Sequence, residues 1–178
     1  EASAGGWRTV VLPRQRGGRL TFHRRERQDI VAAVHSLRPD LVHAHGTGIY
    51  AAAAVDSRLP TVITVHGIVF REARIYRGWP NRLRGWLDSA FERSCLRRAR
   101  RLISISPYVE RELQGLTRAH TDSIENPVDA LFFEAVGEPQ PQRILFPGRL
   151  IPRKGVHHLL AAFALLARDY PQAELVLA

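Results

Sequence analysis

The sequence of 178 residues is short of several residue types: it has one cysteine, one lysine and no methionine. A single cysteine, Cys95, excludes an intrachain disulfide and favours a reducing compartment. No apolar run approaches the roughly 20 residues that a membrane-spanning helix needs. Aromatic residues make up 8% of the chain and form no stacking pattern for single-stranded nucleic acid, so we expect no nucleic-acid partner. We expect a cytoplasmic protein.

Positive charge is supplied almost entirely by arginine. Lys154 is the only lysine among 26 basic residues, and the formal net charge is +9. Such an excess favours anionic partners such as anionic lipid or phosphorylated ligands. Codon bias alone explains an arginine-rich chain, so a role for Lys154 depends on where the residue lies.

Strand-like and helix-like segments alternate along the chain. Apolar and β-branched runs predict strands at residues 8–13, 40–46, 61–67, 102–106, 143–150 and 173–178. Helical periodicity and caps predict helices at residues 25–39, 47–59, 81–101, 107–115 and 155–170. Loops are expected at 67–80 and an irregular segment at 121–133. This alternation predicts a parallel sheet with helices on both faces, and ligands at the carboxyl ends of its strands.

The helix predicted at residues 81–101 has an apolar stripe with arginines elsewhere around it. The stripe consists of Leu83, Trp86, Leu87, Ala90, Phe91 and Leu96. A basic helix of this kind is able to contact anionic lipid, although a solvated surface helix shows the same composition. Both interpretations stay open from the sequence.

A proline-rich segment, "EPQPQ", separates two series of alternating elements. Proline here favours a connector rather than a helix or strand. We therefore assign residues 1–137 to a first α/β domain, 138–142 to a linker and 143–178 to the start of a second domain.

Three predicted strand ends carry polar groups and glycine. They present His43, His45 and Gly46; His66 and Gly67; and Gly148, Arg149 and Lys154. At the third, a glycine allows close backbone approach, and the following helix offers free amides and a positive dipole end. Arginine grips phosphate bidentately and lysine adds a compact charge, so the pattern predicts a diphosphate site. It is neither a P-loop nor a GxGxxG motif.

The histidines of the first two strand ends admit a second interpretation. His43 and His45 form an HxH pattern that also occurs at the metal sites of barrel hydrolases, with His66 as a third ligand. No acidic residue follows a strand in a comparable place, which favours a site without metal. We expect His43 to be a buried core residue and His45, Gly46, His66 and Gly67 to line a cleft. Cys95 and the serines of residues 104–106 are expected to be structural.

Five segments together resemble a known family. "PDLVHAHG", "TVITVHG", "LISISPYVERELQ", "IENPVD" and "FPGRLIPRKGVHHLLAAFALL" are similar, in this order, to blocks of the family 4 retaining glycosyltransferases. The resemblance implies an α/β protein of the GT-B fold, with two Rossmann-like doubly wound domains, both incomplete in this chain. It implies transfer of a hexosyl group from a UDP- or GDP-sugar with retained anomeric configuration. No cofactor or metal is implied.

The resemblance also assigns roles to residues. Arg149 and Lys154 would hold the donor diphosphate and stabilise the leaving phosphate, and His66 would lie near the donor sugar, so these three are the catalytic candidates. Asn126 and Asp129 would belong to the crossover between the domains. The acceptor is undetermined; a lipid-linked or polysaccharide precursor fits the family, as does peripheral contact with an anionic membrane.

Several departures from the family pattern accompany these roles. The family's first strand with its glycine-rich loop would precede Glu1, and its paired-glutamate segment would follow Ala178, so we expect this chain alone to be inactive. Pro127 stands where the family often has glycine. The alternative from another class is a non-catalytic basic module that binds an anionic polymer or membrane.

Overall fold

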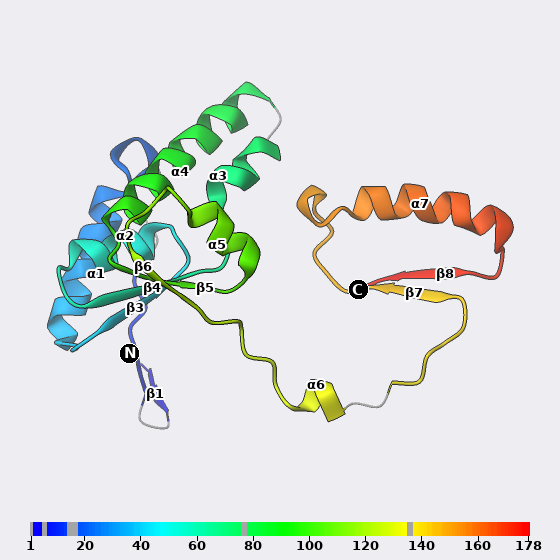
Figure 1. The fold of residues 1–178 in the computed structure, drawn as a ribbon, viewed down its shortest axis with the longest axis horizontal. Coiled ribbons are helices and arrows are strands. Elements are labelled where there is room, and N and C mark those ends of the chain that lie inside the picture. Colours follow the sequence, from blue (N-terminus) through cyan, green and yellow to red (C-terminus); the bar gives the residue numbers. More distant parts are fainter. Residues whose placement is uncertain (1, 5–6, 14–17, 76–77, 135–136) are drawn as a thin grey trace. The chain divides into compact units, whose positions relative to one another are not determined.

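The computed structural model describes residues 2–4, 7–13, 18–75, 78–134 and 137–178. The chain divides into two compact units, Glu1–Asn126 and Pro127–Ala178 (Figure 1). Both are built from parallel strands joined by helices, so the predicted α/β class is confirmed. The unit boundary falls before the proline-rich segment at 138–142, and the domain assignment from sequence stays a prediction.

A parallel four-stranded sheet forms the centre of the first unit. Its strands are β3 (Val42–His45), β4 (Thr61–Val65), β5 (Arg101–Ser104) and β6 (His120–Ser123), in that spatial order. The strand β6 lies in a segment that we expected to be irregular. Its residues are His, Thr, Asp and Ser, so it lacks the apolar alternation that signals a strand, and its place comes from pairing with β5.

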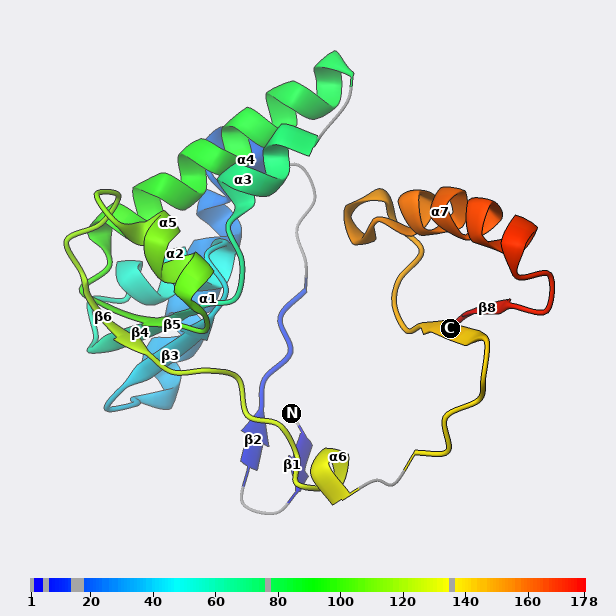
Figure 2. The same cartoon turned by 45° about the vertical axis from the view of Figure 1, so that its right-hand side comes forward.

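The helices of the first unit lie on one side of this sheet. They are α1 (Arg24–Leu37), α2 (Ile49–Asp56), α3 (Val69–Glu72), α4 (Trp79–Arg98) and α5 (Pro107–Leu113), with 3-10 turns at Gly18–Thr21 and Ala73–Ile75. Of these, α1 packs against α2, and α3 packs against α4. Every step from β3 to β6 moves to the next strand in the same direction. Right-handed crossovers therefore place α2, α4 and α5 on the same side, as Figures 1 and 2 show.

The hydrophobic core lies between these helices and the sheet. Its buried members include Ala44, Ile63 and Leu102 from adjacent strands, which are in register, and Leu96 from α4. On the opposite face of the strands His43 and His45 are exposed and Ile103 is partly exposed. Among the described residues the helices lie on the first face only, and helices on the second face stay a prediction. All crossovers advance in one direction, so none returns over the second face.

The long helix α4 is buried along only part of its predicted stripe. Phe91 and Leu96 are buried, whereas Leu83 and Trp86 are 45% and 67% exposed. A 20-residue helix is about 30 Å long, and the longest strand of the sheet, with five residues, is about 17 Å long. The amino-terminal half of α4 therefore extends beyond the sheet and packs beside α3 (Figure 1).

Two further segments differ from the sequence-based expectation. Residues 8–13 were predicted to form a strand from their apolar run, but the strand β2 (Trp7–Thr9) ends at Thr9 and Val11 is 83% exposed. The strand β2 pairs antiparallel with β1 (Ala2–Ala4), outside the four-stranded sheet. The expected loop after β4 contains α3 and a 3-10 turn, because Glu92 caps α3 as described below.

The second unit is one strand–helix–strand element preceded by the short helix α6 (Leu131–Glu134). The strand β7 (Arg143–Phe146), a 3-10 turn (Pro152–Lys154), α7 (Val156–Asp169) and β8 (Glu174–Leu177) follow in order. β7 and β8 pair in parallel. No described side chain of this unit is buried, because two short strands and one helix do not enclose a core. None of the helices in the described ranges of the chain has both the length and the apolarity needed to cross a membrane.

Leu96 and Leu83, both on α4, give a test of this packing. Leu96→Ala should lower the free energy of unfolding by about 3 kcal/mol, because it opens a cavity in the core. The matched change Leu83→Ala, on the exposed half of the same helix, should alter it by less than about 1 kcal/mol. Urea unfolding followed by circular dichroism measures both, and equal losses would contradict the described packing.

Candidate functional site

Two glycine-containing turns lie side by side at the carboxyl edge of the sheet. The strands β3 and β4 are adjacent and parallel, with His45 in register with Thr64. The amide of Gly46 donates to the carbonyl of Thr64 at 2.8 Å, so pairing continues to the end of β3. Gly46 has φ of 85°, a left-handed conformation that glycine adopts without strain. The parallel register thus brings His45 and His66 to one edge.

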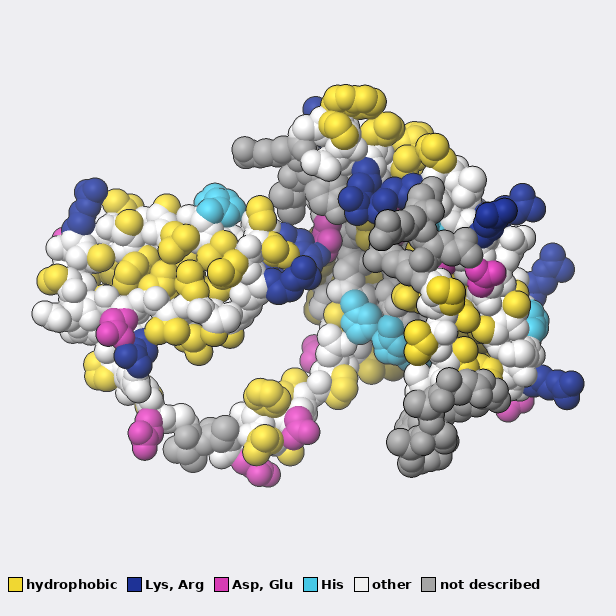
Figure 3. Space-filling model, turned by 180° about the vertical axis from the view of Figure 1, so that it is seen from behind, with side chains coloured by type: hydrophobic (Ala, Val, Ile, Leu, Met, Phe, Trp, Pro, Cys, Tyr) yellow, Lys and Arg dark blue, Asp and Glu magenta, His cyan; other side chains and the backbone are white. Residues whose placement is uncertain are grey.

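The three histidines of these strands form a continuous row. His45 Nδ1 and His66 Nε2 are 2.9 Å apart, and one of them donates a hydrogen bond to the other. The ring centroids of His43 and His45 are 4.4 Å apart, and those of His45 and His66 are 5.2 Å apart. Figure 3 shows histidine side chains gathered beside hydrophobic ones on the face seen from behind. The row offers hydrogen-bond donors and acceptors along an open surface.

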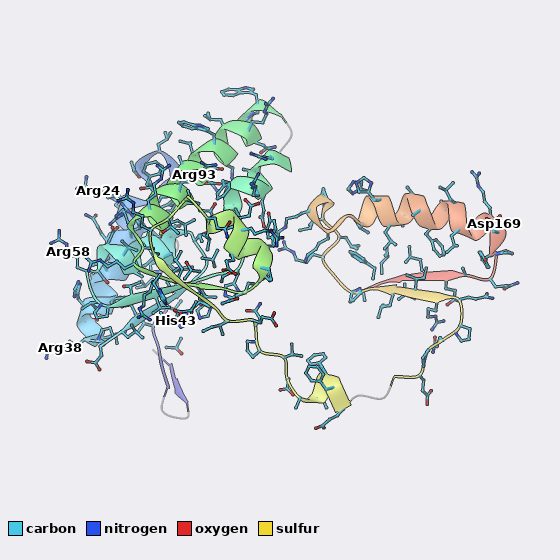
Figure 4. All side chains as sticks on the ribbon, in the orientation of Figure 1. Arg24, Arg38, His43, Arg58, Arg93 and Asp169 are labelled. Carbon is cyan, nitrogen blue, oxygen red and sulfur yellow. The ribbon has the colours of Figure 1, made fainter. Side chains whose placement is uncertain are left out.

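The position of His43 corrects the sequence-based expectation of a buried core histidine. Its side chain is exposed on the face without helices, where its Nε2 lies 2.8 Å from Thr64 Oγ1. Alternation along β3 explains this, because Ala44 takes the buried face and its neighbours take the other. Figure 4 labels His43 at the sheet and Arg93 on the layer of helices. Partial desolvation lowers the pKa of His43, and charge on His45 or His66 lowers it further.

The histidine row does not have the geometry of a metal centre. Within the described ranges, no group of three or more His, Cys, Asp or Glu side chains is arranged to hold a metal ion. The HxH pattern at residues 43–45 therefore gains no support as part of a hydrolase site from this geometry.

A buried carboxylate that the sequence did not single out lies behind the two turns. Glu92 of α4 is 1% exposed and accepts hydrogen bonds from Thr47 Oγ1, from the amide of Val69 at 3.0 Å and from the amide of Phe70 at 2.8 Å. Burial raises the pKa of Glu92. The sequence does hold one indication that Glu92 is buried. Glu92 is one helical turn from Leu96 and next to Phe91, on the apolar side of the helix.

Cys95 and the two serines have structural roles, as predicted. Burial raises the pKa of the Cys95 thiol to about 11, which leaves it protonated at neutral pH. Ser106 caps α5 by accepting from the amide of Val109 at 3.3 Å. The hydroxyl of Ser104 is buried and donates to the carbonyl of Ser106 at 2.9 Å.

The predicted diphosphate-binding residues lie in the second unit, in the turn between β7 and α7. The amide of Gly148 donates to the carbonyl of Ala178 at 2.9 Å, which ties the start of the turn to the end of β8. Gly155 has φ of 73° and forms the cap from which α7 begins. Arg149 and Lys154 are exposed on this turn and have no ion pair among the described residues. Both cations therefore lie in the turn that leads into the positive end of a 14-residue helix.

Comparison with known proteins identifies the family of the chain. A profile of glycosyltransferase family 4 matches residues 2–130. An uncharacterized glycosyltransferase, YqgM, of Bacillus subtilis is 34% identical over 81% of this chain and 40% of its own length. A glycogen synthase of Mycobacterium tuberculosis is 32% identical over 80% of this chain and 36% of its own. The chain belongs to glycosyltransferase family 4, and it spans about two fifths of the length of these relatives.

The lowered pKa of His43 predicts a pH dependence of stability. The pKa of His43 in the folded chain lies below its unfolded value of 6.5. At a pH well above 6.5 the residue is neutral in both states and costs no stability. As the pH falls below that value, the unfolded chain binds a proton that the folded chain excludes, and stability is lost. His43→Gln should therefore reduce the drop in melting temperature between about pH 7.5 and about pH 5. His35→Gln, on the exposed side of α1, is the control, and an unchanged drop in His43→Gln would contradict the prediction.

Proposed function

We propose that the full-length protein containing this chain is a retaining glycosyltransferase that moves a hexosyl group from a UDP- or GDP-sugar to an acceptor. The observation that carries the proposal is the turn between β7 and α7, where Arg149 and Lys154 stand at a helix amino terminus after a parallel strand. Membership in glycosyltransferase family 4 supports the same reaction.

Charge development during the reaction explains why two cations belong at this turn. When the glycosidic bond to the donor breaks, negative charge grows on the departing diphosphate. Fixed positive groups stabilise that charge more in the transition state than in the ground state. Arg149 offers a planar fork and Lys154 a point charge, and the helix dipole adds to both. In this proposal protein cations carry the role that a divalent metal has elsewhere, so the reaction needs no metal and no further cofactor.

The histidine pair of the first unit fits a role toward sugar hydroxyl groups. His66 and His45 are exposed and are held in a fixed mutual orientation by their hydrogen bond. Each neutral imidazole uses one ring nitrogen in this bond, so the pair keeps one donor and one acceptor, which matches a hydroxyl group. We assign His66 to the donor sugar, with His45, Gly46 and Gly67 lining the same edge of the sheet.

The exposed half of α4 supports contact with an anionic membrane surface. Trp79, Leu83 and Trp86 are exposed there, and Arg82 and Arg93 lie on the same helix. Figure 3 shows hydrophobic side chains at this end of the first unit with basic ones nearby. Tryptophan with arginine suits the headgroup region of a membrane. A lipid-linked acceptor is consistent with this surface, and a polysaccharide acceptor with the glycogen synthase relative.

A ligand screen separates this proposal from a non-catalytic basic module. The full-length protein should bind UDP- or GDP-sugars by calorimetry, with a preference among bases and sugars. It should bind equally well with and without a chelator. Vesicles with and without anionic lipid form the second arm and test the surface of α4. Binding to heparin and anionic vesicles alike, without preference among nucleotide-sugars, would favour the basic module instead.

The lysine gives the sharpest test of the diphosphate assignment. Lys154→Ala should lower turnover roughly 10²- to 10³-fold, the range for loss of one preorganised charge stabiliser. Lys154→Arg should not restore full activity, because a planar fork does not occupy the place of an ammonium group. Melting temperatures should stay near the wild-type value, since the side chain is exposed. Wild-type turnover in Lys154→Ala would refute the assignment.

A further inference from the structure

Glu92 joins the two turns that carry the histidine pair. Its bond from Thr47 reaches the segment two residues after His45. Its bonds from the amides of Val69 and Phe70 reach the segment three and four residues after His66. One side chain on α4 thus holds both strand-end turns from behind the sheet edge.

We propose that Glu92 is a positioning residue that sets the distance and orientation of His45 relative to His66. The hydrogen bond between the two rings joins two turns that are 21 residues apart in the sequence. Strand pairing fixes the turns as far as Gly46 and Thr64. Beyond that point Glu92 is the shared support, because both turns donate to the same carboxylate. For catalysis this inference rests on the proposed function, but for the geometry of the pair it does not.

The chemistry of the contact explains why this residue is a glutamate. All three partners of Glu92 act as donors here, and a carboxylate is a side chain that only accepts. Glutamine would direct its amide hydrogens at one of these donors and leave that donor unpaired in a buried place. Burial is the main cause that raises the pKa of Glu92, and the nearby Glu72 adds to it. The three donors act in the opposite direction and hold the carboxylate in one orientation.

A purely structural cap of α3 is the competing explanation, and it differs in what it does to the histidines. If Glu92 only stabilised the helix, its loss would lower the melting temperature and leave the imidazoles of folded molecules unchanged. If it positions the pair, its loss would change the environment of both imidazoles in molecules that remain folded.

Imidazole NMR of the purified protein with labelled histidine tests the proposal. In Glu92→Gln the resonances of His45 and His66 should shift, while those of His157 and His158 on α7 stay in place. Ser89→Ala is the matched control, because it removes a hydrogen bond confined to α4, from Ser89 Oγ to the carbonyl of Gly85. Unchanged resonances of His45 and His66 in Glu92→Gln, with only a lower melting temperature, would overturn the proposal.

A milder pair of variants keeps the test decisive if Glu92→Gln does not fold. Thr47→Val removes one donor at nearly constant shape and should shift the resonances of His45 more than those of His66. Thr47→Ser restores the hydroxyl and should restore the wild-type spectrum. Equal spectra for Thr47→Val and wild type would count against the proposal.

Kinetics then separate this inference from the proposed function. In the full-length protein Thr47→Val should lower kcat roughly 10-fold, with KM for the donor changed less, because misplacement of a positioned group acts mainly on the transition state. Absence of any transfer by the wild-type protein would refute the proposed function, and the NMR result would still stand for or against the positioning role. Shifted resonances with wild-type kcat would refute a role of Glu92 in the reaction.

Discussion

The parallel pairing of β3 with β4 is the constraint on which the rest of the first unit depends. Its register sets His45 opposite Thr64, so both strands end at the same edge of the sheet, where His45 and His66 share a hydrogen bond. Side-chain alternation then directs Ala44 into the core and the two flanking histidines to the open face. A shift of one residue would exchange these faces and bury the imidazoles.

The direction of the crossovers follows from the same sheet. Because β3, β4, β5 and β6 are ordered in space as in sequence, right-handed connections place their helices on one side. That side becomes the core, and α4 brings a carboxylate to the sheet edge from within it. The other side keeps polar groups accessible. One topological rule therefore separates the packing face from the face that carries the candidate site.

The second unit shows how little structure the predicted phosphate-binding turn needs. A glycine with positive φ starts α7, and the exposed cations Arg149 and Lys154 precede it, while no described side chain of the unit is buried. The backbone geometry comes from local hydrogen bonds such as that from Gly155 to Pro152. Such a turn is readable from sequence, because its determinants are adjacent along the chain. A buried cluster such as that around Glu92 draws on residues about 20 to 45 positions apart.

The sequence by itself determined the elements with local signatures: the helices α1, α2, α4 and α7, the apolar strands β4 and β5, and the cap at Ser106. Tertiary structure decided what depends on neighbours. The polar strand β6 forms because it pairs with β5. Leu83 and Trp86 are exposed because α4 is longer than the sheet beneath it. His43 is exposed because no crossover covers its face. Burial of Glu92 was decided in the same way, since three donors from distant segments meet its carboxylate and offset part of the cost of burying it.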